Sequence, residues 1–151
     1  MIQIRGHSFD PWAELVNYQT GNRILLSQAG ATCVFVGTMR DFNDGNSVRS
    51  MLLEHYSGMT EKQLANIIDA AKQQWSFSDV LLVHRTGEIE PSETIVLLAT
   101  WAAHRGDAYD ANRFIMESLK SKAPFWKKEI LADGKARWVE KNTDGYSQLP
   151  K

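Results

Sequence analysis

The sequence predicts a single α+β domain with a mostly antiparallel sheet. Several apolar, β-branched segments have the composition of strands, and three others have the periodicity or the capping residues of helices. Neighbouring strand segments are joined by short turns, whereas a doubly wound parallel sheet needs a helix between strands. A chain of 151 residues that is 43% hydrophobic is large enough for one core. We therefore expect residues 1–140 to form one domain and residues 141–151 a polar tail.

The composition excludes several classes of protein. The formal net charge is -1, so the chain as a whole is not a polycation that binds nucleic acid. Cys33 is the only cysteine, which excludes an internal disulfide and a cysteine metal cluster. No apolar stretch reaches the roughly 18 residues that span a bilayer, and the N-terminus lacks the apolar region of a signal peptide. We expect a soluble protein of a reducing compartment, most simply the cytoplasm, with no metal site.

The first elements are a short strand and a short helix. Residues 1–4 alternate in the manner of a strand. Asp10 is a favourable N-cap residue and Pro11 suits the first helical position, so a helix is expected from Pro11 to about Tyr18.

Residues 30–39 are β-branched and aromatic, which predicts a buried strand. Cys33 lies inside it and is interpreted as a small buried hydrophobe rather than a nucleophile. Gly37 indicates a bulge or a close approach by another backbone. Arg40 follows, at the start of the turn-forming residues 41–47, which predict a mobile loop. There Arg40 is either a substrate clamp or an ordinary surface residue.

A second strand is predicted over residues 48–56. The group Glu54-His55-Tyr56 inside it is interpreted as structural, because no second histidine lies at metal-ligand spacing. Thr60 to Gln63 match a capping box, which predicts a helix over residues 60–75. Its apolar residues recur at helical spacing: Leu64, Ile67, Ile68, Ala71 and Trp75.

Two more strands and a long helix follow. Residues 80–88 read as a strand, residues 90–93 as a turn, and residues 94–103 as the most continuous apolar strand, expected at the centre of the sheet. The next helix is expected to begin with Asp107 as its cap and to run to about Lys122. Its inner face is predicted to comprise Ala111, Ile115 and Leu119.

The corner between that strand and that helix is a candidate anion site. His104 and Arg105 lie beside the helix N-terminus, where backbone N–H groups and the positive end of the helix dipole are available. The alternative is that both side chains pair with nearby acidic residues.

A cluster of lysines surrounds the end of the same helix. Pro124 ends the helix, residues 125–131 read as a strand, and a turn at Asp133-Gly134 makes a hairpin with residues 137–139. No acid separates the four lysines of this segment, which are Lys120, Lys122, Lys127 and Lys128. Held close together, ammonium groups bind an anion or lower the pKa of one lysine. The alternative is a solvated helix end, but the adjacent Pro-Phe-Trp favours a pocket.

Five segments together resemble the MoaE family, the large catalytic subunits of molybdopterin synthase. They are FVGTMR at 35–40, LEHYSGM at 53–59, HRTG at 84–87, AHR at 103–105 and LKSKAPFWKKE at 119–129. The resemblance extends over residues 30–140, and the lysine-rich segment is its most specific part. It implies an α/β hammerhead fold with a small β subdomain.

The resemblance also implies partners and a reaction. Members of this family form a homodimer that binds two copies of a small ubiquitin-fold sulfur carrier, MoaD, in a heterotetramer. The carrier's C-terminal thiocarboxylate supplies two sulfurs to cyclic pyranopterin monophosphate (precursor Z). The product is the metal-free dithiolene molybdopterin of molybdenum cofactor biosynthesis, so we expect no cofactor in this chain. Neither nucleic acid nor a membrane is an expected partner.

Carried over by position, Lys120 and Lys127 correspond to the family's catalytic lysines. The resemblance implies these substrate-binding residues: Thr38, Met39, Arg40, His104, Arg105, Lys120, Lys127, Lys128 and Glu129. Phe35 and Met116 are expected to form pocket walls.

Our hypothesis is that Arg40, His104 and Arg105 hold the substrate's phosphate. Lys120 acts as acid and base, and Lys127 stabilises negative charge. This requires all the cations to line one cavity. The alternative function is a non-catalytic module that binds an anion or RNA, or a scaffold that docks a ubiquitin-like partner.

Overall fold

The computed structural model describes residues 1–140 and 145–146, so most of the predicted tail, 141–151, lies outside the described residues. The larger sheet has four strands in the order β1-β5-β7-β2. Its strands are β1 (Ile2–Arg5), β5 (Asp79–Arg85), β7 (Thr94–Ala102) and β2 (Ala31–Thr38). β1 and β5 are parallel and the other pairs are antiparallel. The predicted α+β class with a mostly antiparallel sheet is confirmed.

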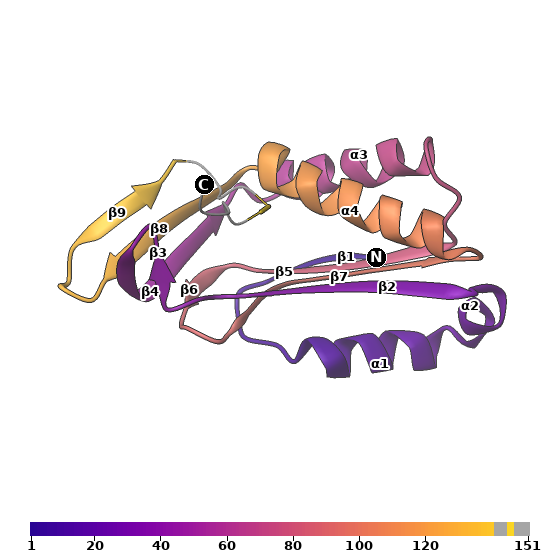
Figure 1. Ribbon diagram of the computed structural model, residues 1–151, viewed down its shortest axis with the longest axis horizontal. Helices are drawn as coiled ribbons and strands as arrows, with labels where there is room; N and C mark the ends of the chain where they lie inside the picture. Colours follow the sequence, from indigo (N-terminus) through magenta and orange to yellow (C-terminus); the bar gives the residue numbers. More distant parts are fainter. Residues whose placement is uncertain (141–144, 147–151) are drawn as a thin grey trace, which may run out of the picture.

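Helices cover both faces of this sheet. α3 (Met59–Lys72) and α4 (Arg105–Lys122) lie on one face and α1 (Pro11–Gly21) on the other, and Figure 1 shows this three-layer arrangement. A short helix, α2 (Arg23–Gln28), follows α1 and was not anticipated from the sequence. None of the helices in the described ranges is long and apolar enough to cross a membrane.

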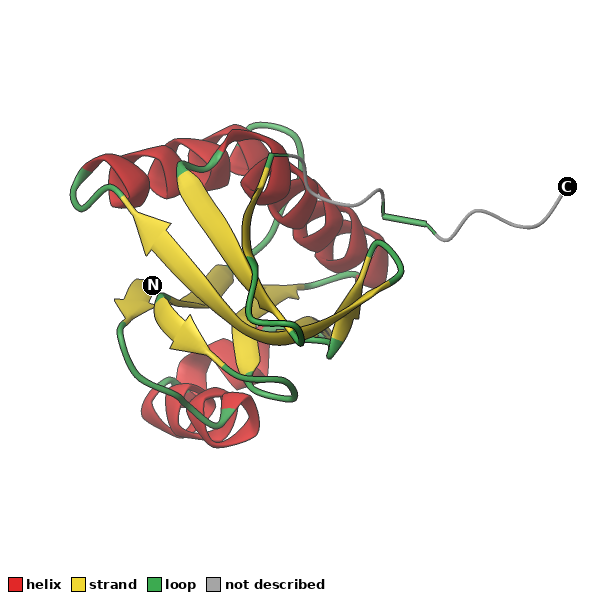
Figure 2. Ribbon diagram, turned by 90° about the vertical axis from the view of Figure 1, so that its left-hand side faces the viewer, coloured by secondary structure: helices red, strands yellow, loops and turns green. Residues whose placement is uncertain are grey.

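The second sheet lies at one end of the molecule, beyond the C-terminal end of α4 (Figure 1). Its strand order is β3-β4-β8-β9, with β6 also paired to β4. The bounds are β3 (Phe42–Asn43), β4 (Asn46–His55), β6 (Gly87–Ile89), β8 (Phe125–Leu131) and β9 (Ala136–Val139). Figure 2, which looks from this end, shows strands of the second sheet in front of the helical layers.

The predicted core is largely the observed core. Leu64, Ile67, Ile68 and Ala71 of α3 are buried as their spacing predicted, but the helix ends at Lys72, and Trp75 beyond it is only partly buried. Ala111, Ile115 and Leu119 of α4 are buried as predicted. β7 lies between β5 and β2, and its residues from Val96 to Ala102 are all buried. The expectation of a central apolar strand is therefore confirmed.

Residues 80–88 do not form one strand, as the sequence analysis expected. The strand β5 ends at Arg85, and the chain bends before β6 begins at Gly87. Gly87 adopts a φ of 88°, a conformation that favours glycine. Arg85 is buried and its guanidinium donates to the carbonyls of Thr86 and Glu88. The bend directs β6 away from the first sheet and into the second.

Residues 41–47 are a hairpin rather than a simple loop. β3 pairs with β4 around Asp44 and Gly45, whose φ values of 48° and 75° are both positive. Two successive positive φ angles are the signature of a tight hairpin turn, and Asp-Gly is a preferred sequence for it.

β2 forms where predicted but is not a buried strand. It is the outermost strand of its sheet, and none of its residues is fully buried. Gly37 does mark an irregularity, because the pairing register with β7 shifts between Gly37 and Thr38. A Cβ at Gly37 would approach Val96 to 2.9 Å.

Two of the three predicted helix caps were misplaced. Gly58, not Thr60, caps α3, and the backbone N–H of Gly58 donates to Glu61. Thr60 is instead buried, and its hydroxyl donates to the backbone oxygen of Pro124 at 3.5 Å. His104 occupies the cap position of α4, and Asp107 lies in the first turn, where its carboxylate accepts from the N–H of Ser76. At α1, Asp10 and Pro11 act as predicted, although the helix continues to Gly21.

Candidate active site

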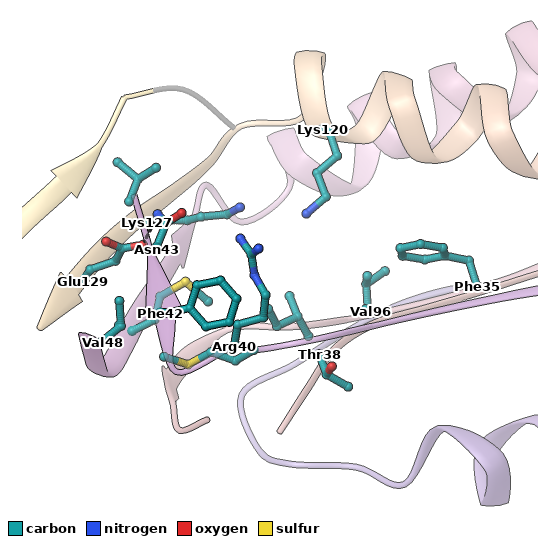
Figure 3. Close-up of a pocket in the computed structure, with 15 residues that line it drawn as sticks. Phe35, Thr38, Arg40, Phe42, Asn43, Val48, Val96, Lys120, Lys127 and Glu129 are labelled. Atoms are coloured by element: carbon teal, nitrogen blue, oxygen red, sulfur yellow. Dashed lines mark hydrogen bonds between the residues drawn. The ribbon is translucent and has the colours of Figure 1, made fainter. Parts of the chain in front are cut away.

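Lys120 and Lys127 approach each other because the chain reverses direction at Pro124. Lys120 lies on the last turn of α4, and the residue before the proline, Ala123, is extended with φ -74° and ψ 137°. This conformation ends the helix, as expected for a residue that precedes proline. The chain then enters β8, from which Lys127 extends toward the same space. Figure 3 shows the ends of both side chains directed toward that of Arg40.

These three cations line a cavity of about 260 Å³. Arg40 comes from the segment between β2 and β3, so the cavity lies where the two sheets meet. The guanidinium carbon of Arg40 lies 4.9 Å from the ring centroid of Phe42, in a cation–π contact. Thr38, Met39 and Phe35 also line the cavity, together with apolar side chains of β4 and β7.

A second, narrower cavity of about 60 Å³ lies on the other side of the lysines. Lys120 and Lys127 line both cavities, and the remaining walls of the second include Leu53, His84 and Phe125. The pair of amines thus borders two spaces, a larger and more open one and a smaller one.

Burial and neighbouring positive charges disfavour the ammonium forms of the two lysines. Burial, followed by the charge of Lys120, lowers the pKa of Lys127 to about 8, while Glu129 opposes the change. Burial also lowers the pKa of Lys120, and the nearby charge of Arg40 contributes. A lysine with a pKa near 8 exists in both protonation states around neutral pH, so it can accept and return a proton.

His84 is a residue of this region to which the sequence analysis gave no role. Its ring stacks on Phe125, with centroids 4.0 Å apart and planes at 14°. Its Nδ1 lies 2.9 Å from the carbonyl oxygen of Arg85. Burial, with the charges of both lysines, lowers the pKa of His84 to about 3, so the ring is neutral. The sequence signals were a histidine within an apolar strand and its place in the HRTG segment at 84–87.

One chain does not bring His104 and Arg105 into the lysine cavity. They lie at the first turn of α4, whereas Lys120 lies on its last. Lys120 is the fifteenth residue after Arg105 on this helix, which corresponds to about 22 Å at the usual rise. His104 and Arg105 instead line a shallow hollow with Gly30 and Tyr109. The expectation that one chain gathers all the cations is wrong.

Lys128 also faces away from the cavity. Side chains alternate along a strand, so Lys127 and Glu129 share one face of β8 and Lys128 has the other. Its amine lies 5.5 Å from the ring centroid of Trp138 on β9.

Glu129 lines the cavity, but protein groups engage its carboxylate. Asn43 Nδ2 donates to one oxygen at 2.6 Å and Arg137 Nε donates to the other at 2.9 Å. Met116, on α4, is buried in the core and borders a separate groove rather than the lysine cavity.

Cys33 shows no sign of activation. Burial raises the pKa of its thiol, which keeps it protonated, and the residue does not border the lysine cavity. Within residues 1–140 and 145–146, no three His, Cys, Asp or Glu side chains gather in an arrangement that would hold a metal ion. The chemistry available at the cavity is therefore that of two amines and a guanidinium, which suits an anionic substrate and proton transfer.

Comparison with known proteins identifies similar chains. The family model described as "MoaE protein" matches residues 10–122. The molybdopterin synthase catalytic subunit of Ralstonia nicotianae is 51% identical over 139 residues, which are 92% of this chain and 76% of that protein. The corresponding subunit of Haemophilus influenzae is 50% identical over 122 residues, 81% of each protein.

Solved structures of similar sequence have the same fold. The molybdopterin biosynthesis MoaE protein of Burkholderia ambifaria superimposes with a TM-score of 0.76 at 44% identity, covering 96% of this chain and 92% of that one. The crystal structure of molybdopterin synthase from Staphylococcus aureus gives a TM-score of 0.78 at 33% identity, covering 91% and 95%.

Proposed function

The chain belongs to the MoaE family, and on that premise we propose that it is the catalytic, sulfur-transferring subunit of a molybdopterin synthase. Its substrate is cyclic pyranopterin monophosphate, and its sulfur donor is the C-terminal thiocarboxylate of a MoaD-like carrier. Two transfers produce the dithiolene of molybdopterin.

The observation that best supports this function is the convergence of Arg40, Lys120 and Lys127 on one cavity. The chain has a formal net charge of -1, so this concentration of positive charge is local. Buried positive charges held close together are stabilised when an anion binds between them. A phosphorylated pterin and a thiocarboxylate are both anions, and both have to reach the same amines.

The two cavities suggest separate places for the two reactants. The larger one, with Arg40 and Phe42, suits the phosphate and the pterin ring. The narrow one suits an extended glycine tail, which has no side chains to accommodate. Because Lys120 and Lys127 border both cavities, a sulfur on the tail and the carbon that it attacks would meet beside the amines.

The roles of the side chains follow from their charges. Arg40 holds the phosphate and stabilises the charge that develops as the cyclic phosphate opens. Lys120 and Lys127 exchange protons with the reacting groups, which a lowered pKa permits near neutral pH. The donor brings its own sulfur nucleophile, so this chain requires no reactive cysteine and no cofactor.

A homodimer would supply the cations that one chain lacks. β2 is the last strand of its sheet, and among the described residues its outer edge pairs with no strand. One end of β2 adjoins Gly30, beside His104, and the other end adjoins Arg40. If two copies paired their β2 strands antiparallel about a two-fold axis, each His104 and Arg105 would approach the Arg40 of the other copy.

Reconstitution tests the function. The purified chain is mixed with thiocarboxylated carrier and cyclic pyranopterin monophosphate, and the dithiolene product is detected. We expect product only when all three are present. A stable complex with carrier but no product would support the scaffold alternative. Binding to single-stranded RNA that weakens steeply with salt would support the RNA-binding alternative.

A further inference from the structure

A partly buried polar network joins the β3–β4 hairpin beside the lysine cavity to strands β8 and β9. Its centre is Glu129, which is only 5% exposed to solvent. Asn43 of β3 and Arg137 of β9 each donate to one of its carboxylate oxygens. Arg137 Nη2 also donates to the backbone oxygen of Asn43 at 3.0 Å, so the three residues form a closed ring of contacts. We call these residues the Asn43–Glu129–Arg137 latch.

The latch fixes one end of the segment that includes Arg40. At the other end, the backbone of Met39 donates to Glu93 and accepts from Ser92, at 2.9 and 2.8 Å. Residues 39–43 are therefore held at both ends, and Arg40 lies between. β3 itself is only two residues long, so its own pairing with β4 gives little support.

Contact with Phe42 links the latch to the guanidinium. Phe42 adjoins Asn43 in sequence and its ring contacts Arg40, with 4.9 Å between the guanidinium carbon and the ring centroid. Displacement of β3 would move this ring and the side chain that rests on it. Figure 3 shows Asn43 near Glu129 on one side and Arg40 directed toward the lysines on the other.

We propose that Arg137 is a positioning residue of the reaction, which acts through Glu129 and Asn43 to hold Arg40 toward Lys120 and Lys127. Arg137 does not itself border the lysine cavity. It lies directly opposite Glu129 in the pairing of β8 with β9, where opposite charges stabilise each other. In this arrangement Glu129 is a structural anchor for Arg40 rather than a ligand of the substrate.

The test has one arm that is independent of activity and one that rests on the proposed function. In the first, amide hydrogen exchange of residues 41–48 is compared between the full-length wild type and Arg137→Gln. We expect exchange in the β3–β4 hairpin to be at least about tenfold faster in Arg137→Gln, because the contacts of Arg137 with Glu129 and Asn43 that oppose opening of this hairpin are lost. Lys135→Gln is the matched control, because Lys135 is highly exposed and lies in the β8–β9 hairpin with Arg137. In this variant, residues 41–48 should exchange as in the wild type.

In the second arm, kcat/KM for dithiolene formation is measured with Arg137→Gln, Arg40→Gln and the double variant, each bound to carrier. We expect Arg137→Gln to lose about 10- to 100-fold, as for other small displacements of a reacting group. The double variant should be no worse than Arg40→Gln alone, because both changes act through the same guanidinium. Arg137→Lys, which keeps the charge but has a single donor group, should restore part of the loss.

The outcomes separate the two hypotheses. Unchanged hairpin exchange in Arg137→Gln, or losses that multiply in the double variant, would overturn the latch. No product from the wild type, with faster exchange in the variant, would overturn the proposed function and leave the latch standing. If Arg137→Gln does not fold, Asn43→Asp decides, because its negative charge would repel Glu129 and should also accelerate exchange of the hairpin.

Discussion

Lys120 and Lys127 lie on opposite sides of Pro124 in the sequence, yet they border the same two cavities. The proline ends α4, and the strand that follows directs the second amine back toward the first. Burial lowers the pKa of both amines, and the charge of Lys120 lowers that of Lys127 further.

The titration of Lys127 should respond to its neighbours in opposite directions. NMR titration of the lysine side chains should give Lys127 a midpoint near pH 8. Lys120→Met should raise that midpoint, because a repelling charge is removed, and Glu129→Gln should lower it, because an attracting charge is removed. A Lys127 midpoint near that of an exposed lysine, unaffected by either change, would contradict this description of the site.

The free energy of unfolding should depend on pH because the pKa of Lys127 is lowered in the folded state. Below pH 8, Lys127 is protonated in the folded and the unfolded chain, so the folded state bears the full cost of burying the charge. Between about pH 8 and 10.5 the folded state releases its proton first, so the free energy of unfolding rises with pH.

Lys127→Met should therefore be more stable than wild type at pH 7, by about 1–3 kcal/mol, with the difference shrinking above pH 8. Denaturant unfolding across this range measures the effect. Lys122→Met, at an exposed position of the same helix end, should show no such pH-dependent difference. A gap between Lys127→Met and wild type that stayed constant from pH 7 to pH 10 would argue against a buried, repelled ammonium.

Mixing two inactive variants should restore activity if a second copy contributes Arg105. Lys120→Ala and Arg105→Ala are purified separately, each expected to be inactive, then mixed under conditions that allow subunits to exchange. Random exchange should give about a quarter of wild-type activity, because half of the dimers are hybrids and each hybrid has one intact site. No recovery after proven exchange would place both residues in the site of a single chain or remove Arg105 from it.

Gly30 should not tolerate a side chain. A Cβ there would overlap the backbone oxygen of Ala103, which cannot move without shifting the corner between β7 and α4. Gly30→Ala should destabilise the protein by about 1–3 kcal/mol in denaturant unfolding. Gly106→Ala, near the same corner but with open space around the added methyl, is the control and should have little effect.

Much of the fold could be predicted because local signals agreed with the tertiary structure. The strand of β7 is apolar along its length because both of its faces are covered by helices, and the stripe of α3 reflects a single buried face. The break between β5 and β6 gave no such signal. It depends on Arg85, whose guanidinium satisfies two backbone carbonyls at the bend, and a contact of this kind has no periodicity to detect.

The candidate site was predictable in part. That Lys120 and Lys127 would meet followed from a proline placed between a helix and a strand. The distance from Lys120 to Arg105 also follows from helix geometry, and the helix predicted from Asp107 to Lys122 already implied it. His84 and Asn43 lie far in sequence from the residues that they contact, so their roles depend on tertiary packing, whereas Arg137 lies opposite Glu129 in the β8–β9 hairpin.

The most direct measurement of the central claim compares Lys120→Ala with Lys122→Ala in the reconstituted reaction, both saturated with thiocarboxylated carrier. The two lysines are separated by one residue, but only Lys120 borders the cavities. We expect Lys120→Ala to bind carrier normally and to form dithiolene at least about a hundredfold more slowly, while Lys122→Ala retains the wild-type rate. Turnover by Lys120→Ala at a rate close to that of Lys122→Ala would contradict the account.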